Sequence, residues 1–395
     1  MAPASFPRSP ATSATSRSTV PPLTWCRTTP NGKADVFVKD LRTGQVTLVS
    51  ADAQGNQGNS DSNSSLSSIS GTGRYVAFDS FATNLVPDDT NAALDVFVKD
   101  LRTGQVTLAS ADAQGNQGNA SSVGTSISRD GRAVAFTSFA TNLLPDGTKG
   151  EQVFVKDLRT GQVTLASANA DGTEGNDSFG GSSFAASLSA DGHAVAFTSS
   201  ASNLVPDDTN GSSDVFVKDL DTGQVTLASA NADGTEGNYS SVSGSASLSG
   251  NGRFVAFSSY ATNLLPDGTK GEQVFVKDLS TGQVTLASAD AGGNAGDRIS
   301  INPAISPNGR YVSFTSNASN LVAGDTSSVE NIFVKDLWSG EVKQLTDNTA
   351  SVINRFGPGQ ERSVVANTGA VAFTSPASNL VPGDTNGVFN IFLST

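Results

Sequence analysis

The chain of 395 residues is long enough for two or three ordinary domains or for one large repeat array. Only 15% of its residues are charged, and the missing charge is mostly the helix-favouring Glu and Lys, which excludes an all-helical or coiled-coil fold. A net charge of −13 would repel a phosphate backbone, which argues against nucleic acid as a partner, and no apolar run reaches the ~20 residues of a membrane-spanning helix.

Residues 1–33 do not share the pattern of the rest of the chain. They are rich in Ser, Thr and Pro, a composition typical of disordered segments. If codons for residues 13–30 are regrouped by one base, suitable choices spell a string that closely matches residues 74–91. We therefore interpret 1–33 as a disordered leader read in a shifted frame, with a native flexible leader as the alternative. The leader shows neither the basic start nor the apolar core of a secretory signal.

From residue 34 onward the sequence repeats with a period of about 60 residues. The string VFVKDL or a close variant recurs seven times, and a VAF or VSF string recurs six times at the same period. The phenylalanines of the first string are Phe37, Phe97, Phe154, Phe216, Phe275, Phe333 and Phe392. The phenylalanines of the second string are Phe78, Phe136, Phe197, Phe257, Phe314 and Phe373. Aromatic residues at a fixed phase of a repeat indicate core positions.

Each repeat contains four short β-type segments. In the first complete repeat they are Leu66–Ser70, Tyr75–Asp79, Asp95–Asp100 and Gln105–Ser110. The first and second segments are joined by a tight turn, and so are the third and fourth, whereas the second-to-third loop is long. Four antiparallel strands per repeat predict a β-propeller blade, because one such sheet cannot bury both of its faces unless its neighbours stack against it.

The strand count predicts one propeller domain over 34–395. Five complete units span about 65–346, residues 363–395 supply three strands, and residues 34–50 supply the last two strands of a unit. We expect the two chain ends to pair in one composite blade, which gives six blades, with seven as the alternative.

The repeat resembles that of the TolB-type β-propeller family. Residues 303–346 carry the features of the resemblance: a Ser-Pro-Asn-Gly turn, a strand ending in Phe, the NIFVKDL strand, a Ser-Gly turn and a strand ending in Leu-Thr. The resemblance covers about 34–395 and implies a propeller fold and a periplasmic or secreted location. It implies no single activity, because propellers carry many functions.

The long second-to-third loops carry the candidate metal ligands. Acids and amides at i, i+2 and i+6 are oxygen donors that suit Ca²⁺, although no bidentate Glu follows at the EF-hand distance. The predicted ligands are Asp89, Asn91, Asp95, Asp208, Asn210, Asp214, Asp384, Asn386 and Asn390. The alternative is that these residues hold their own turns by hydrogen bonding to the backbone. Two further loops have Lys149 and Lys270 in place of the amide, and we expect no metal there.

Few residues are available for catalysis. The single histidine, His193, occupies a position that holds Arg in other repeats, and the single cysteine, Cys26, excludes an intrachain disulfide. We therefore predict a non-enzymatic, monomeric binding or scaffold protein that engages a protein or glycan through its long loops. The alternatives are a hydrolase or lyase with a pocket near the central channel, around 290–301 and 347–362, and a degenerate product without function.

Overall fold

Every regular element in the described part of the chain is a β-strand, and all the strands pair antiparallel. The computed structural model describes residues 15–20, 31–176, 184–241, 246–325, 329–346, 363–375, 380–381 and 390–394. The all-β class expected from the sequence is confirmed.

Five sheets contain four strands each, paired in chain order. The first two sheets comprise β4 (Ser62–Ile69), β5 (Tyr75–Ser80), β6 (Asp95–Asp100), β7 (Val106–Leu108), β8 (Ser122–Ile127), β9 (Ala133–Ser138), β10 (Gln152–Asp157) and β11 (Val163–Leu165). The next two comprise β12 (Phe184–Leu188), β13 (Ala194–Ser199), β14 (Asp214–Asp219), β15 (Val225–Leu227), β16 (Ser247–Leu248), β17 (Phe254–Ser259), β18 (Gln273–Asp278) and β19 (Val284–Leu286). The fifth comprises β20 (Ser300–Ile305), β21 (Tyr311–Ser316), β22 (Asn331–Asp336) and β23 (Val342–Gln344).

Two three-stranded sheets come from the ends of the chain. The first contains β1 (Thr15–Val20), β2 (Asp35–Asp40) and β3 (Val46–Leu48), and the last contains β24 (Val364–Val365), β25 (Val371–Ser375) and β26 (Asn390–Ser394). Within the described ranges β3 pairs with β2 and β26 with β25, so the composite pairing of the two chain ends is not among the observed strand pairs. Counting the terminal sheets as one blade gives the expected six, and counting them separately gives the alternative of seven.

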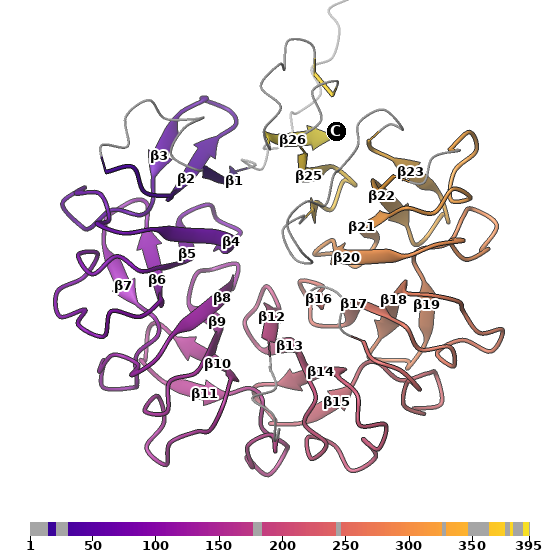
Figure 1. Cartoon of the computed structure of the whole chain (residues 1–395), viewed down its shortest axis with the longest axis horizontal. Helices are drawn as coiled ribbons and strands as arrows, with labels where there is room; N and C mark the ends of the chain where they lie inside the picture. The colour runs from indigo at the N-terminus through magenta and orange to yellow at the C-terminus, as the bar shows by residue number, and fades with distance from the viewer. Residues whose placement is uncertain are drawn as a thin grey trace, which may run out of the picture.

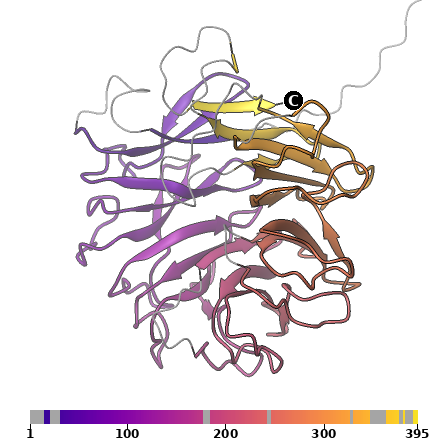
Figure 2. The same cartoon turned by 45° about the vertical axis from the view of Figure 1, so that its right-hand side comes forward.

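The sheets are arranged around a common centre, as in a β-propeller (Figure 1). The first strand of each complete sheet lies nearest the centre and the fourth lies outermost. Neighbouring sheets pack face to face, which the turned view shows clearly (Figure 2). The propeller predicted from the repeats is therefore the fold of this chain.

Strand β1 lies inside the segment expected to be a disordered leader. It pairs with β2 so that Ser18 is opposite Phe37, the place that Phe78 takes opposite Phe97 in the first complete blade. Thr15–Val20 therefore form a strand in the structure, although the composition of the segment predicts disorder. The physical reason is that an open strand edge offers backbone donors and acceptors that pair with almost any sequence. The remainder of 1–30 lies outside the described residues.

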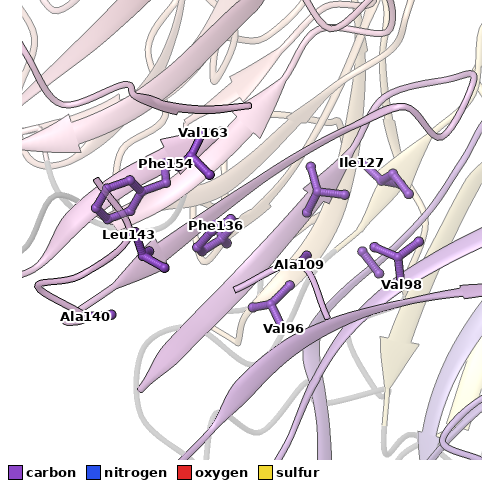
Figure 3. Close-up of a cluster of buried hydrophobic side chains, with 11 residues drawn as sticks. Val96, Val98, Ala109, Ile127, Phe136, Ala140, Leu143, Phe154 and Val163 are labelled. Carbon is purple, nitrogen blue, oxygen red and sulfur yellow. The ribbon is translucent and has the colours of Figure 1, made fainter. Parts of the chain in front are cut away.

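The hydrophobic core lies between the blades. One cluster joins Val96 and Val98 of β6 to Phe136 of β9 and Phe154 of β10 in the next sheet (Figure 3). In the five complete blades and in the C-terminal sheet, the two repeat phenylalanines face each other across neighbouring strands, with ring centroids 5.7–6.0 Å apart. The fixed phase of these residues in the sequence therefore did mark the core.

Polar groups also link each blade to the one before it. Near the centre, the backbone N–H of Ile127 on β8 donates to Ser68 Oγ on β4, and that of Leu188 on β12 donates to Ser126 Oγ on β8. Farther out, the buried Lys156 on β10 donates from Nζ to the backbone carbonyls of Ala111 and Asp112, which follow the preceding blade. The lysine that recurs in VFVKD is thus a link between blades.

One turn glycine is also fixed by contact with a neighbouring blade. Gly131 has a φ of +77°, and a Cβ there would overlap the Tyr75 ring of the preceding blade. Gly115 has a φ of +90° but has open space around it, so a substitution there measures the cost of backbone strain alone. We expect Gly115→Ala to cost about 1–2 kcal/mol from backbone strain and Gly131→Ala to cost a further 1–3 kcal/mol from the clash. Urea unfolding of both variants measures the difference, and equal losses would show that the ring moves aside freely.

Candidate functional site

The long loops of the repeats meet at one end of the blades. Asn84, in the β5–β6 loop, donates from Nδ2 to the carbonyl of Gln57, which precedes β4, and Asn91 donates to that of Gly118, which follows β7. We call this end the long-loop face. Its described residues are 49–61, 81–94, 109–121, 139–151, 166–176, 200–213, 228–241, 260–272, 287–299 and 317–325.

The tight turns lie at the opposite end of the blades, and His193 follows one of them. Arg74 forms a two-pronged pair with Asp100, joining the first and second tight turns of one blade. His193 takes the Arg position in its blade and lies with Nδ1 2.9 Å from an Asp221 carboxylate oxygen. This carboxylate raises the pKa of His193. The histidine therefore lies at the end of its blade opposite to the long-loop face.

In the first loop that we predicted to bind a metal, a glutamine amide lies between the two aspartates. Gln117, in the loop that leaves the same blade, donates from Nε2 to Asp89 Oδ1 at 2.7 Å and to Asp95 Oδ2 at 2.8 Å. Ser110 Oγ donates to the other oxygen of Asp95 at 2.6 Å. Burial raises the pKa of both Asp89 and Asp95, and these hydrogen bonds oppose the rise. An amide nitrogen therefore stands between the two carboxylates.

The second predicted metal loop brings three acids together. Asp208 and Asp214 meet Glu236, which replaces the glutamine in the loop that leaves this blade, and one carboxylate oxygen of each lies within 4.8 Å of the others. Burial, followed by the contact with Glu236, raises the pKa of Asp208 to about 7, and burial raises that of Asp214 to about 6. Among the described residues, these three acids are the group whose oxygens lie close enough together to hold one metal ion.

The amide ligands predicted in these two loops, Asn91 and Asn210, hold turns in this structure. Asn91 accepts the backbone N–H of Ala93 at its Oδ1, and Asn210 accepts that of Ser212. The Asn210 Nδ2 donates to Asp214 Oδ2 and to the Gly237 carbonyl. The side-chain oxygens of Asn91 and Asn210 therefore accept hydrogen bonds within their own turns, which is the alternative to metal binding given above. The additional acid is Glu236, and its sequence signal was the change from Gln to Glu 22 residues after the distal aspartate.

The remaining candidate loops differ from these two. Gln152 replaces the distal aspartate in one of the lysine-containing loops; its Oε1 accepts a hydrogen bond from Ser167 Oγ, and its Nε2 donates to the Lys149 carbonyl. The C-terminal candidates Asp384 and Asn386 lie outside the described residues. Asn390 begins β26, where its Cα is paired with that of Ser375.

Exposed aromatic residues lie on the same face, at the equivalent position of three blades, and we call these three residues the aromatic row. Phe81, Phe139 and Tyr260 each follow the second strand of their blade, and their side chains are 47%, 44% and 42% exposed. Their backbone N–H groups donate to the carbonyls of Asp61, Ser121 and Ser240, each of which precedes the first strand of the same blade. Tyr239 and Ile299 are also exposed in these loops. Our sequence reasoning missed this row, whose signal was an aromatic residue directly after the VAF strand.

The region suggested for an enzyme pocket is only partly described. Residues 347–362 lie outside the described ranges, and Arg298 is exposed on the long-loop face. A cavity of about 490 Å³ is lined by residues of the loops after β19 and β21, among them Asp290 and Asp325. Asp290 itself accepts backbone hydrogen bonds from Gly292 and Asn294, so its carboxylate is engaged in a turn. Among the described residues, no helix is long and apolar enough to cross a membrane.

Comparisons with known proteins show likeness in fold. No protein-family model and no curated protein matches the chain. The propeller domain of the trilobed protease from Pyrococcus furiosus is 13% identical, with a TM-score of 0.53 over 91% of this chain and 84% of that domain. A prolyl endopeptidase structure is 13% identical, with a TM-score of 0.50 over 91% of this chain and 46% of that one.

TolB structures are also similar. TolB from Acinetobacter baumannii is 17% identical, with a TM-score of 0.45 over 91% of this chain and 75% of that one. A putative TolB from Agrobacterium tumefaciens is 15% identical, with a TM-score of 0.43 over 79% of this chain and 88% of that one. The fold is thus that of a β-propeller, and TolB structures, whose repeat the sequence resembles, are among the solved structures similar to it.

Proposed function

We propose that the chain is a non-enzymatic binding propeller that engages a protein or glycan partner through its long-loop face. The observation that carries the proposal is the row formed by Phe81, Phe139 and Tyr260. Large aromatic residues exposed on one face mark interaction surfaces, because their rings gain contact area at a low cost in conformational entropy. One ring in each of three blades presents similar contacts repeatedly around the centre.

The repetition itself supports binding rather than catalysis. Loops of related sequence recur around the propeller, with PDDTN in two blades and PDGTKG in two others, which favours several similar contacts with one large partner. A catalytic pocket needs different groups brought together at one place. Acids and amides beside the rings provide the hydrogen bonds expected around such anchors. We also propose a periplasmic or secreted location, on the basis of the repeat's resemblance to the TolB type.

The aromatic row can be removed without altering the fold. The third complete blade has Ser200 at the same position, so serine is already accommodated in this setting. We expect the triple variant Phe81→Ser, Phe139→Ser and Tyr260→Ser to bind its partner at least about tenfold more weakly, since anchor side chains contribute 1 kcal/mol or more each. Affinity capture from extracts of the source organism and arrays of purified glycans measure the loss against wild type.

The opposite face provides the matched control. Trp338 is 72% exposed beside the tight turns and occupies the position of Arg102 in the first complete blade. Trp338→Arg should therefore leave partner binding unchanged. Equal binding by the wild type and the triple variant, or a loss caused by Trp338→Arg alone, would place the interaction elsewhere.

A further inference from the structure

Two loops that share the string PDDTN face different residues from the loop that leaves their blade. The PDDTN loops place Asp89 and Asp95 in one blade and Asp208 and Asp214 in another. The third member of each group comes from the loop that leaves the blade, and it is a glutamine in the first case and Glu236 in the second. Two blades of one chain therefore have an amide and a carboxylate, respectively, at the equivalent position of the repeat.

The two side chains are held in the same way. The backbone N–H of Thr90 donates to Gln117 Oε1 at 3.1 Å, and that of Thr209 donates to Glu236 Oε2 at 3.1 Å. Gln117 then uses its Nε2 to donate to both aspartates. Glu236 has an oxygen at that position and cannot donate while it is ionised. Replacing the amide therefore removes the positive end of a dipole from between two carboxylates and adds a third negative charge.

The three acids lie in a buried setting, where one carboxylate oxygen has no hydrogen-bond partner. Asp208 is 6% exposed, and its Oδ2 is buried without a hydrogen-bond partner. Asp214 is fully buried, and its carboxylate accepts hydrogen bonds from Ser229 Oγ and Asn210 Nδ2. A buried carboxylate oxygen without a donor is costly unless a cation or a proton compensates it.

The spacing of the oxygens matches a hard divalent cation. Oxygen ligands lie at about 2.3–2.6 Å from Ca²⁺, so two ligands of one ion are at most about 5 Å apart. One oxygen from each of the three carboxylates meets this limit, since all lie within 4.8 Å of one another. We propose that Asp208, Asp214 and Glu236 bind Ca²⁺, which takes the place that the Gln117 amide nitrogen occupies in the other blade.

The proposed site belongs to one blade of the repeat and does not depend on the partner proposed above. In a lysine-containing loop the distal aspartate is Gln152, and Glu174 there accepts the backbone N–H of Lys149. That loop lacks the two aspartates that face Glu236. Among the described residues, the proposed site therefore requires two aspartates and one glutamate together and is not a property of the acidic loops in general.

Calcium titration of the full chain tests the proposal directly. The protein is stripped with a chelator, and binding of Ca²⁺ alone is measured by calorimetry and by the shift in melting temperature. Glu236→Gln copies the arrangement of the other blade, so it should fold normally and lose one calcium site. The variant should also lose the calcium-dependent rise in melting temperature, because an ion that binds only the folded state stabilises it.

The reverse substitution is the matched gain-of-function variant. Asp89 Oδ2, like Asp208 Oδ2, is buried without a partner. Gln117→Glu should therefore add one calcium site to the wild-type number. Wild-type protein that binds no Ca²⁺ at millimolar concentration, a Glu236→Gln variant that binds as tightly, or a Gln117→Glu variant without an added site would each overturn the proposal. The first result would show that a shared proton, not a cation, compensates the three acids.

Discussion

Replacing Asp79 by threonine should stabilise the protein by on the order of 4 kcal/mol at pH 8 and by much less at pH 4. Asp79 lies on β5 with 3% of its surface exposed, and burial raises its pKa to about 7. The corresponding residues of the other complete blades are uncharged: Thr137, Thr198, Ser258 and Thr315. The threonine is therefore a residue that this position already accepts elsewhere in the chain.

The sign of the pH dependence follows from where the proton is bound. The pKa of Asp79 in the unfolded chain is near 3.9, so between pH 4 and 7 the folded state holds a proton that the unfolded state has released. The free energy of unfolding consequently falls by up to about 1.4 kcal/mol per pH unit across this window. Below pH 4 the two states hold the proton equally and the penalty vanishes.

Urea unfolding at pH 4, 6 and 8 measures this effect. The difference between the wild type and Asp79→Thr should widen with rising pH and level off above pH 7. Asp79→Asn is the matched control, because it removes the charge while keeping the shape of the side chain. Parallel pH profiles for all three proteins would show that the Asp79 carboxylate finds a compensating partner in the folded state.

Replacing Lys156 by methionine should lower the free energy of unfolding by about 2–4 kcal/mol. The Lys156 Nζ donates to the carbonyls of Ala111 at 2.6 Å and Asp112 at 2.7 Å, and the side chain is buried. Methionine fills a similar volume but leaves both carbonyls without this donor, and hydrogen bonds to charged groups contribute about 1.5–3 kcal/mol each before the recovered desolvation of the ammonium is subtracted. Burial lowers the pKa of Lys156, which reflects that desolvation.

An exposed lysine serves as the control for this variant. Lys343 lies 3.5 Å from Glu341 on the surface, and Lys343→Met should change stability by less than about 0.5 kcal/mol. Urea midpoints of the two variants, measured at the same pH, give the comparison. Similar midpoints for Lys156→Met and the wild type would mean that water replaces the ammonium at the two carbonyls.

The repeat predicted the fold well because it fixes both pairing and burial. The expected strand Asp95–Asp100 has the bounds of β6, whereas the expected Gln105–Ser110 shortens to Val106–Leu108 in β7. The shortening has a local cause, since the backbone N–H groups of Ala109 and Ser110 both turn back to the Val96 carbonyl. Strand β4 begins earlier than expected, at Ser62. An irregularity between Asn63 and Ser68 interrupts the pairing with β5, and Ser62 and Asn63 pair with β5 on its far side.

Less of the candidate site than of the fold could be predicted from the sequence. Aspartates within one loop could be recognised by their spacing, but Glu236 reaches them from a different loop, so its contribution depends on how the blade closes. The exposed rings of Phe81 and Phe139 could not be distinguished from core phenylalanines by residue type alone. Their position one residue beyond the strand end decides it, because there the side chain leaves the packed sheet for the loop surface.

The lysine links between blades have a direction. The acceptors of Lys99, Lys156 and Lys218 all precede the lysine in the chain, by 44 to 50 residues. During synthesis on the ribosome, the carbonyls that receive each ammonium have therefore already been made when the lysine emerges. Each new blade can dock on a finished neighbour without waiting for later sequence, so the order of translation is also an order of assembly that keeps exposed apolar surface to about one blade at a time.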